Sequence, residues 1–256
     1  MSEISMEAGF SKVKTILVSQ PDPGEKSPYG ELAKKHKVKV DFRPFTQVDG
    51  VSVNDFRKSR VILSDYGSII FNSKNAIDNY FKVAAAVKYD TPSTIKYFCI
   101  SEQIAVYLQK YIQMRKRKVF FGKGKLDEII PMMQKHKEDK YLIPCSENPE
   151  AAFIALAQSK GFDITPSLMY RTVSSDLSDL ADVKYDILVF FNPLAIKSLF
   201  ENFSDFKQEK TRLAVFGKTT EEAALRHGLV PNIVAPSVTL PSMAMALEDY
   251  IKRANK

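Results

Sequence analysis

The stretch SIIFNSKNAIDNYF, Ser68–Phe81, decides the fold of this chain. It begins with an apolar run typical of a buried strand, continues through a polar turn, and ends with apolar residues at helical spacing. The same pattern returns as ILVFFNPLAIKSLF at Ile187–Phe200, 119 positions later, so that Ser73 falls on Asn192. Such self-similarity predicts that one strand–turn–helix architecture has been used twice.

A second echo follows each copy. FCISEQIAVYL at 98–108 lies over AVFGKTTEEAA at 214–224, which places Ser101 on Gly217. Two echoes in the same order indicate two like α/β halves. Because ligands of open α/β sheets bind beyond the carboxyl ends of the strands, we expect a cleft lined by these turns.

The rest of the chain alternates between strands and helices. Between residues 52 and 162 the patterns predict strands at 68–71, 97–100, 119–121 and 141–144 and helices at 54–59, 73–87, 102–112, 126–137 and 149–160. After residue 182 they predict strands at 186–191, 212–216 and 232–235 and helices at 193–203, 219–228 and 241–253. This alternation is typical of parallel, doubly wound α/β sheets.

Two extended, proline-bearing segments, Val38–Phe45 and Asp163–Val173, bracket the middle of the chain. We therefore predict two similar three-layer α/β domains with parallel sheets, joined by a two-stranded extended linker, with the cleft between them. The predicted limits are a discontinuous domain at 1–40 plus 172–256, an inserted domain at 48–164, and linker strands at 41–47 and 165–171. Residues 1–11 are expected to form a disordered tail.

Composition limits the class of protein. With 256 residues, 45% of them hydrophobic, the chain can bury the core of one or two domains. It shows no signal peptide and no apolar run of membrane-spanning length, and its two cysteines, Cys99 and Cys145, have the context of buried thiols. We expect a cytoplasmic protein without a membrane partner.

The formal net charge is +7, partly concentrated in the basic segment Arg115–Lys118. This balance favours an anionic partner, although the segment also fits a solvated edge. The three histidines are isolated, Gly122-Lys123-Gly124-Lys125 lacks the P-loop pattern, and no G-x-G-x-x-G follows the first strand. We expect neither a metal nor a cofactor.

Small polar residues at strand-to-helix turns are the candidate ligand contacts. They are Asn72, Ser73, Lys74, Ser101, Asn192, Gly217, Lys218, Thr219 and Thr220. The first N–H groups of a helix attract anions, carboxylates included. The alternative for each position is simple helix capping, for which Ser, Thr and Asn are preferred.

Tyr170 is the candidate catalytic residue. It lies in the returning extended segment beside Arg171 and Thr172, where the two domains are expected to face each other. A tyrosine hydroxyl can act as a hydrogen-bond donor or a weak acid. The alternative is an aromatic anchor at a hinge.

These motifs resemble the uroporphyrinogen-III synthase family over nearly the whole chain from Val13. The residues that carry the resemblance are Phe71-Asn72-Ser73 with Ala76-Ile77, Tyr170-Arg171-Thr172, Phe190-Phe191-Asn192-Pro193, Phe216-Gly217-Lys218-Thr219-Thr220 with Gly228, and Pro241-Ser242. The family's two α/β domains and two-stranded linker agree with the architecture predicted above.

The resemblance implies a cofactor-free lyase. The linear tetrapyrrole hydroxymethylbilane loses its hydroxyl to give an azafulvene, which attacks the terminal ring, and a spiro intermediate rearranges so that the last ring closes inverted. In the family, backbone amides hold most of the ligand, and the tyrosine that matches Tyr170 assists departure of the hydroxyl. The product carries eight carboxylates, which accounts for a basic chain with N–H-rich turns.

Three positions depart from the family pattern. Asn72 stands for a threonine, Asn192 for a serine, and Ile104 for a threonine, and only the asparagines can still form hydrogen bonds. A non-catalytic protein that binds polycarboxylate anions through the same fold is therefore the alternative function. Nucleic acid is disfavoured as a partner because the basic segment has few base-stacking aromatics, and we expect a monomer.

Overall fold

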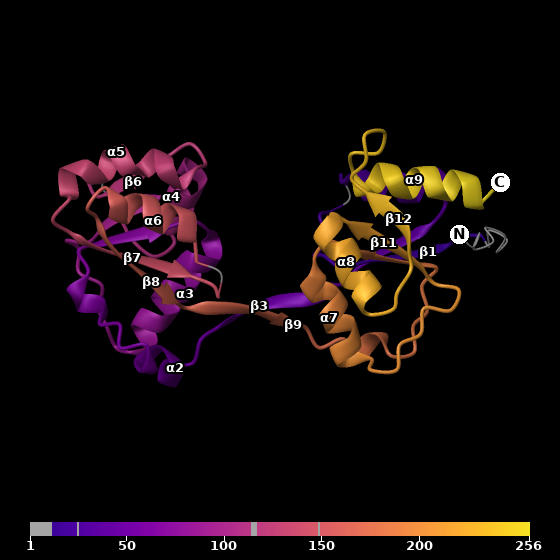
Figure 1. The fold of residues 1–256 in the computed structure, drawn as a ribbon, viewed down its shortest axis with the longest axis horizontal. Coiled ribbons are helices and arrows are strands. Elements are labelled where there is room, and N and C mark those ends of the chain that lie inside the picture. Colours follow the sequence, from indigo (N-terminus) through magenta and orange to yellow (C-terminus); the bar gives the residue numbers. More distant parts are fainter. Residues whose placement is uncertain (1–11, 25, 114–116, 148) are drawn as a thin grey trace. The chain divides into compact units, whose positions relative to one another are not determined.

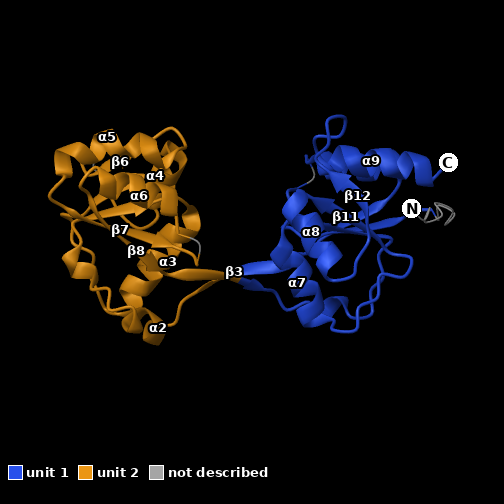
Figure 2. Ribbon diagram, viewed as in Figure 1, with its two compact units in different colours: residues 1–47, 173–256 blue, residues 48–172 orange. Residues whose placement is uncertain are grey.

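The computed structural model describes residues 12–24, 26–113, 117–147 and 149–256. The predicted tail at 1–11 and part of the basic segment, Arg115 and Lys116, lie outside the described residues. The chain divides into two compact units (Figure 2). Unit 1 comprises residues 1–47 and 173–256, and unit 2 comprises residues 48–172.

Unit 2, which contains the strands labelled β6, β7 and β8 in Figure 1, is built on a five-stranded parallel sheet with the order β6-β5-β4-β7-β8. Its strands are β4 (Ser68–Phe71), β5 (Lys96–Cys99), β6 (Val119–Phe121), β7 (Lys140–Cys145) and β8 (Asp163–Leu168). Its helices are α2 (Val53–Lys58), α3 (Lys74–Ala86), α4 (Glu102–Leu108), α5 (Ile130–Met133) and α6 (Ala151–Ser159). Ile69 and Phe71 pack with α3 and α4 on one face, whereas Ile70 packs on the other face with α5 and α6. Alternate side chains of a central strand thus fill two helix-covered layers.

Unit 1 repeats this plan with the strand order β12-β11-β10-β1-β2. Its strands are β1 (Thr15–Val18), β2 (Lys39–Phe42), β10 (Ile187–Phe190), β11 (Arg212–Phe216) and β12 (Pro231–Ala235). Its helices are α1 (Pro28–His36), α7 (Pro193–Asn202), α8 (Lys218–Arg226) and α9 (Met243–Ala254). α1 and α9 cover one face of the sheet, and α7 and α8 cover the other. The prediction of two α/β halves with parallel sheets is confirmed.

The repeat seen in the sequence is a repeat in space. β4 and β10 are the central strands of their sheets, and Phe71 and Phe190 are both buried at their ends. The residues that cap the following helices have nearly the same backbone angles, with φ −156° and ψ 163° at Ser73 and φ −152° and ψ 157° at Asn192. The gapless alignment of the two stretches therefore matches residues in equivalent structural positions.

The chain passes between the units at the boundaries 47/48 and 172/173. There β3 (Thr46–Gly50) and β9 (Tyr170–Ser174) pair as a two-stranded sheet. The linker ranges 41–47 and 165–171 were placed too early, because β8 stays in register with β7 through Leu168. Pro166 did not end the strand because β8 is an edge strand, where a missing N–H is tolerated.

Helix limits differ from the predicted ranges by one or two residues in several places and by more in two helices of unit 2. The helix expected at 126–137 is divided into a 3₁₀ turn at Leu126–Ile129, α5, and a 3₁₀ turn at Gln134–His136. Pro131 lies at the break, where it lacks the N–H that a continuous helix requires. α4 ends at Leu108 instead of residue 112, and α6 begins at Ala151, after Pro149 rather than at it.

The first strand and the last helix of unit 1 are joined at their ends. The backbone N–H of Val13 donates to Asn255 Oδ1 at 2.7 Å, and Asn255 Nδ2 donates to the carbonyl of Val13 at 3.0 Å.

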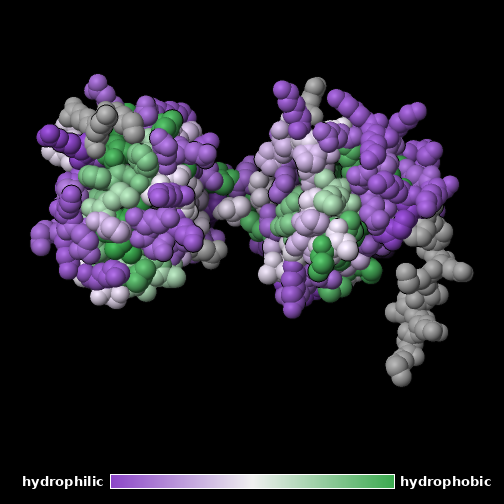
Figure 3. All heavy atoms as spheres, turned by 90° about the horizontal axis from the view of Figure 1, so that it is seen from above, coloured by the Kyte–Doolittle hydropathy of each residue, from purple (hydrophilic) through white to green (hydrophobic). Residues whose placement is uncertain are grey.

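None of the helices within the described ranges is both long enough and apolar enough to span a bilayer. Hydrophilic side chains cover much of the face seen in Figure 3, with smaller apolar areas between them.

Candidate functional site

The turn after β4 brings two of the predicted site residues together. Ser73 caps α3, and its Oγ accepts from the backbone N–H of Ala76 at 3.1 Å. The hydroxyl of Tyr170 lies 3.4 Å from the same Ser73 Oγ. Tyr170 comes two residues after the end of β8, so both residues belong to the carboxyl edge of the sheet of unit 2. This is the edge where open α/β sheets bind their ligands.

Tyr170 is held in its protonated form. Its side chain belongs to the hydrophobic core that includes residues of β4 and α3, and the residue is 8% exposed. Burial raises the pKa of the phenol above its usual value of 10, the hydrogen bond with Ser73 opposes the shift, and the nearby Cys145 and Glu150 add to it. At neutral pH the hydroxyl therefore carries a proton that it can donate to a ligand oxygen.

Glu150 and Cys145 join this turn although sequence reasoning did not select them. Asn72 Nδ2 donates to Glu150 Oε1 at 3.0 Å. Cys145 ends β7, donates to the carbonyl of Ser167 at 3.4 Å, and has a pKa raised by burial. Their position in the sequence could have indicated them: Cys145 ends β7 and Glu150 follows it, and β7 lies beside β4 in the sheet.

Ser101 and Lys74 lie beside the same edge. Ser101 precedes α4 without making a side-chain cap, so its hydroxyl is not used by the helix. The Lys74 ammonium lies 5.2 Å from the centroid of the Tyr107 ring, a cation–π distance. Ile104, which replaces the family's threonine, is half-buried against the core of unit 2.

In unit 1 the matching turns follow β10 and β11. Asn192 caps α7, and its Oδ1 accepts from the backbone N–H of Ala195 at 2.8 Å. Gly217 precedes α8 with φ 85° and ψ 148°, a conformation that residues with a Cβ rarely adopt. A glycine is required there by the backbone and not by crowding, since an added Cβ would meet no atom within 4 Å.

The three residues after Gly217 differ in accessibility. Lys218 and Thr219 form the exposed first turn of α8, where they can meet a ligand. Thr220 is only 1% exposed, and its side chain packs within unit 1. The structure thus brings Asn72, Ser73 and Tyr170 into one cluster of unit 2 and places Asn192 and Gly217 after neighbouring strands of unit 1.

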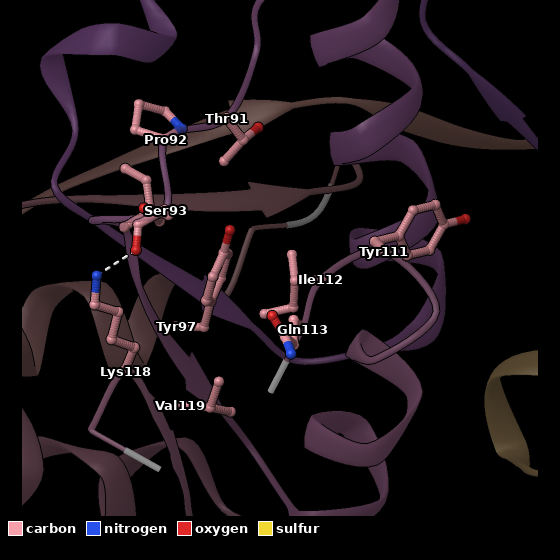
Figure 4. A pocket seen from close by; sticks show the side chains of 10 residues that line it. Thr91, Pro92, Ser93, Tyr97, Tyr111, Ile112, Gln113, Lys118 and Val119 are labelled. Atoms are coloured by element: carbon pink, nitrogen blue, oxygen red, sulfur yellow. Dashed lines mark hydrogen bonds between the residues drawn. The ribbon is translucent and has the colours of Figure 1, made fainter. Parts of the chain in front are cut away.

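The cavities at the opposite edges of the sheets do not contain these residues. In unit 2 a cavity of about 220 Å³ lies near the amino ends of β5 and β6, between Pro92, Tyr97, Ile112 and Val119 (Figure 4). Lys118 donates to the carbonyl of Ser93 at its wall. In unit 1 a larger cavity of about 1040 Å³ lies between the loops that lead into β10 and β11. Cavity size alone does not locate the predicted site.

Comparison with known proteins agrees with the architecture. The family model described as uroporphyrinogen-III synthase HemD matches residues 27–245. The structure of uroporphyrinogen-III synthetase from Helicobacter pylori is 17% identical with a TM-score of 0.55, covering 94% of this chain and 99% of that one. A mutant uroporphyrinogen III synthase from Thermus thermophilus is 16% identical with a TM-score of 0.46, covering 94% and 98%. No curated protein matches the chain in sequence.

The chain belongs to the uroporphyrinogen-III synthase family, because the family model covers most of its length. The Helicobacter pylori structure supports the same fold. Its function is therefore that of a synthase, a hydro-lyase of haem and tetrapyrrole biosynthesis that acts on a tetrapyrrole substrate. The family resemblance seen in the motifs is confirmed.

Proposed function

We propose that the protein cyclises hydroxymethylbilane to uroporphyrinogen III through a site organised around Tyr170 and Ser73. The observation that carries this proposal is the 3.4 Å approach of the Tyr170 hydroxyl to Ser73 Oγ at the carboxyl edge of the unit 2 sheet. A protonated phenol and a serine hydroxyl form a pair of hydrogen-bonding groups suited to a leaving hydroxyl.

The first step is the loss of the substrate's hydroxyl. The C–O bond breaks as the pyrrole nitrogen supplies its electron pair, and the departing oxygen takes a proton to leave as water. Tyr170 donates a hydrogen bond to that oxygen, which favours departure because charge develops there. The raised pKa keeps the donor proton in place at neutral pH.

The later steps depend on orientation. The azafulvene must meet the substituted position of the terminal ring, and holding two ends of a flexible chain together supplies a large part of a rate enhancement. We assign this binding to Asn72, Ser73, Lys74 and Ser101 in unit 2 and to Asn192, Gly217, Lys218, Thr219 and Thr220 in unit 1. Thr220 contributes through its backbone, since its side chain is buried.

The partners and location follow from the same proposal. The ligand is a polycarboxylate tetrapyrrole, for which a chain of net charge +7 is suited. We further propose that the protein acts as a cytoplasmic monomer without nucleic acid. The proposed domains are residues 1–47 plus 173–256 and residues 48–172, with the crossings assigned to the pairing strands β3 and β9.

The test is conversion of hydroxymethylbilane with identification of the isomer formed. We expect the inverted isomer III from the wild type, and Tyr170→Phe should lower turnover more than it lowers product binding. Tyr80→Phe is the matched control, because Tyr80 is a buried tyrosine of the same core whose hydroxyl pairs with Thr91 rather than with Ser73. Accumulation of only the spontaneous, uninverted isomer by the wild type would favour the non-catalytic binding protein instead.

A further inference from the structure

The surface between α3 and α4 contains a cluster of two lysines, two tyrosines and one aspartate beside the proposed site. The Tyr107 hydroxyl lies 2.9 Å from both oxygens of Asp78, and the Tyr111 hydroxyl donates to Asp78 Oδ1 at 2.6 Å. Lys110 lies 5.6 Å from the Tyr107 ring centroid and 5.4 Å from that of Tyr111. Asp78 is thus engaged by two phenols, and it fixes both rings.

Lys74 makes no ion pair with a carboxylate of the described residues, although Glu102 lines the same pocket. Its ammonium lies 5.2 Å from the centroid of the Tyr107 ring. A free lysine side chain loses rotamer entropy when it binds an anion. A ring that already holds the ammonium reduces this loss, which is the advantage of preorganisation.

A surface pocket of about 430 Å³ opens beside this ammonium. It is lined by Lys74, Glu102, Gln103, Val106 and Tyr107. Val106 is 54% exposed, so the pocket offers an apolar wall in addition to the tyrosine ring. A short carboxylate side chain has the matching pattern, since its methylene groups need an apolar wall and its carboxylate needs a cation.

The pocket is placed to serve the proposed reaction. Lys74 follows directly after Ser73, whose hydroxyl contacts Tyr170. A ligand whose reacting end lies at Tyr170 therefore has to pass only the first turn of α3 to reach Lys74. The carboxylate of Glu102 repels an anion in the same pocket, so it lowers the affinity of the pocket for a carboxylate.

We propose that this pocket binds one carboxylate-bearing side chain of the tetrapyrrole, with Lys74 as the binding cation and Tyr107, fixed by Asp78, as the residue that positions Lys74. This inference rests on the proposed function for the identity of the ligand. Lys110 serves as an internal comparison, because it contacts the same ring but does not line the pocket.

The experiment measures KM and kcat with hydroxymethylbilane and, independently of turnover, the Kd for uroporphyrin III, an octacarboxylate, by fluorescence. Lys74→Met should raise KM and Kd about fivefold with little change in kcat, the upper end of an exposed ion pair. Lys74→Arg should restore binding, because a guanidinium also stacks on an aromatic ring and pairs with a carboxylate. Glu102→Gln should tighten binding about twofold.

The role of Tyr107 is separated from a structural one by a double-mutant cycle. Tyr107→Leu should weaken binding about two- to fivefold, the range of an exposed cation–π contact, and Tyr107→Phe should change it less. In a Lys74→Met background Tyr107→Leu should have no further effect on Kd, because Tyr107 acts through Lys74.

Lys110→Met and Lys82→Met control for charge alone, Lys82 being an exposed residue on the same helix, α3. An equal loss of affinity in these controls, or an unchanged Kd in Lys74→Met, overturns the inference. A wild type that binds uroporphyrin III through Lys74 but forms no isomer III overturns the proposed reaction and leaves the pocket assignment standing.

Discussion

The two units use the same strand–turn–helix differently. Ser73 and Asn192 cap equivalent helices with nearly the same backbone angles. The Ser73 oxygen accepts from the helix and is also approached by Tyr170, whereas the Asn192 oxygen accepts from the helix in unit 1 and has no such hydroxyl partner among the described residues. Ser73 therefore caps α3 and also contacts the hydroxyl of Tyr170, whereas Asn192 only caps α7.

The largest expected effect concerns the equivalent aromatic residues Phe71 and Phe190. Replacement of either by alanine should cost about 3–5 kcal/mol, because both are completely or almost completely buried. Hydrogen exchange read by mass spectrometry should show Phe71→Ala destabilising unit 2 and Phe190→Ala destabilising unit 1. Phe121→Ala, at a site that is 38% exposed, is the mild control. Equal loss of protection in both units from either change would show that they unfold as one body.

The second prediction contrasts Gly217 with Ser101, which the sequence echo aligns. Gly217→Ala should destabilise unit 1 by about 1–3 kcal/mol, because alanine is strained at φ 85°. Ser101→Ala should change stability by less than about 0.5 kcal/mol, since Ser101 has an ordinary φ of −150° and makes no cap. Urea denaturation measures both, and a neutral Gly217→Ala would contradict the assigned backbone conformation.

The third prediction separates capping from chemistry. Ser73→Ala and Asn192→Ala should each cost about 1 kcal/mol of stability, the usual value of a lost N-cap. Ser73→Ala should in addition lower kcat about three- to tenfold, because Tyr170 loses a hydrogen-bond partner. Thermal denaturation and the isomer assay measure the two effects. Similar losses of kcat in both variants would remove the functional distinction between the two turns.

The smallest expected effect is on the stability of unit 1 at low pH. In unit 1 Glu248 accepts hydrogen bonds from Lys35, Lys252 and His36, which lower the pKa of its carboxyl from 4.5 to about 2. Because the folded-state pKa is depressed, the stabilisation is present above about pH 4.5 and is lost as the pH falls towards 2. Acid titration followed by circular dichroism should show a weaker pH dependence over this range for Glu248→Gln. An identical profile would mean that the ion pairs contribute nothing in solution.

At high pH the corresponding prediction concerns the hydroxyl of Tyr170. Catalysis by the protonated Tyr170 should persist through neutral pH and fail only as the pH rises above 10, because burial raises its pKa beyond that value. A pH profile of kcat measures this limit. A fall in kcat near pH 8 that Tyr170→Phe abolishes would contradict the assigned protonation.

The sequence supported most of the fold because the strands are short, apolar and bounded by clear turns. β4, β6 and β11 have the predicted limits, since each ends where an apolar run gives way to Asn72, Gly122 or Gly217. The limits failed where proline was decisive, at Pro131 inside a helix and at Pro166 inside an edge strand. Pro166 is tolerated because β8 is an edge strand, a fact that a local pattern does not contain. Pro131 was a local signal that the predicted helix at 126–137 did not take into account.

The site was predictable in part for a similar reason. Residues directly after a strand, such as Ser73, can be selected from one pattern. Glu150 could not be selected in this way, because it reaches Asn72 from a segment 78 positions further along. Tyr107 and Asp78 show the same limit, since their contact joins two helices and neither residue belongs to a turn.

The joined ends of unit 1 have a consequence for biosynthesis. Unit 2 is continuous from residue 48 to residue 172, whereas β1 and α1 belong to a unit whose remaining strands are made only after residue 173. On the ribosome, unit 2 therefore has all its residues for independent folding before unit 1 can complete its sheet. The Val13–Asn255 hydrogen bonds join β1 to the end of α9, so they form only after residue 255 has been synthesised. Until residues after 173 are synthesised, β1 lacks its sheet neighbour β10 and α1 lacks its packing partner α9.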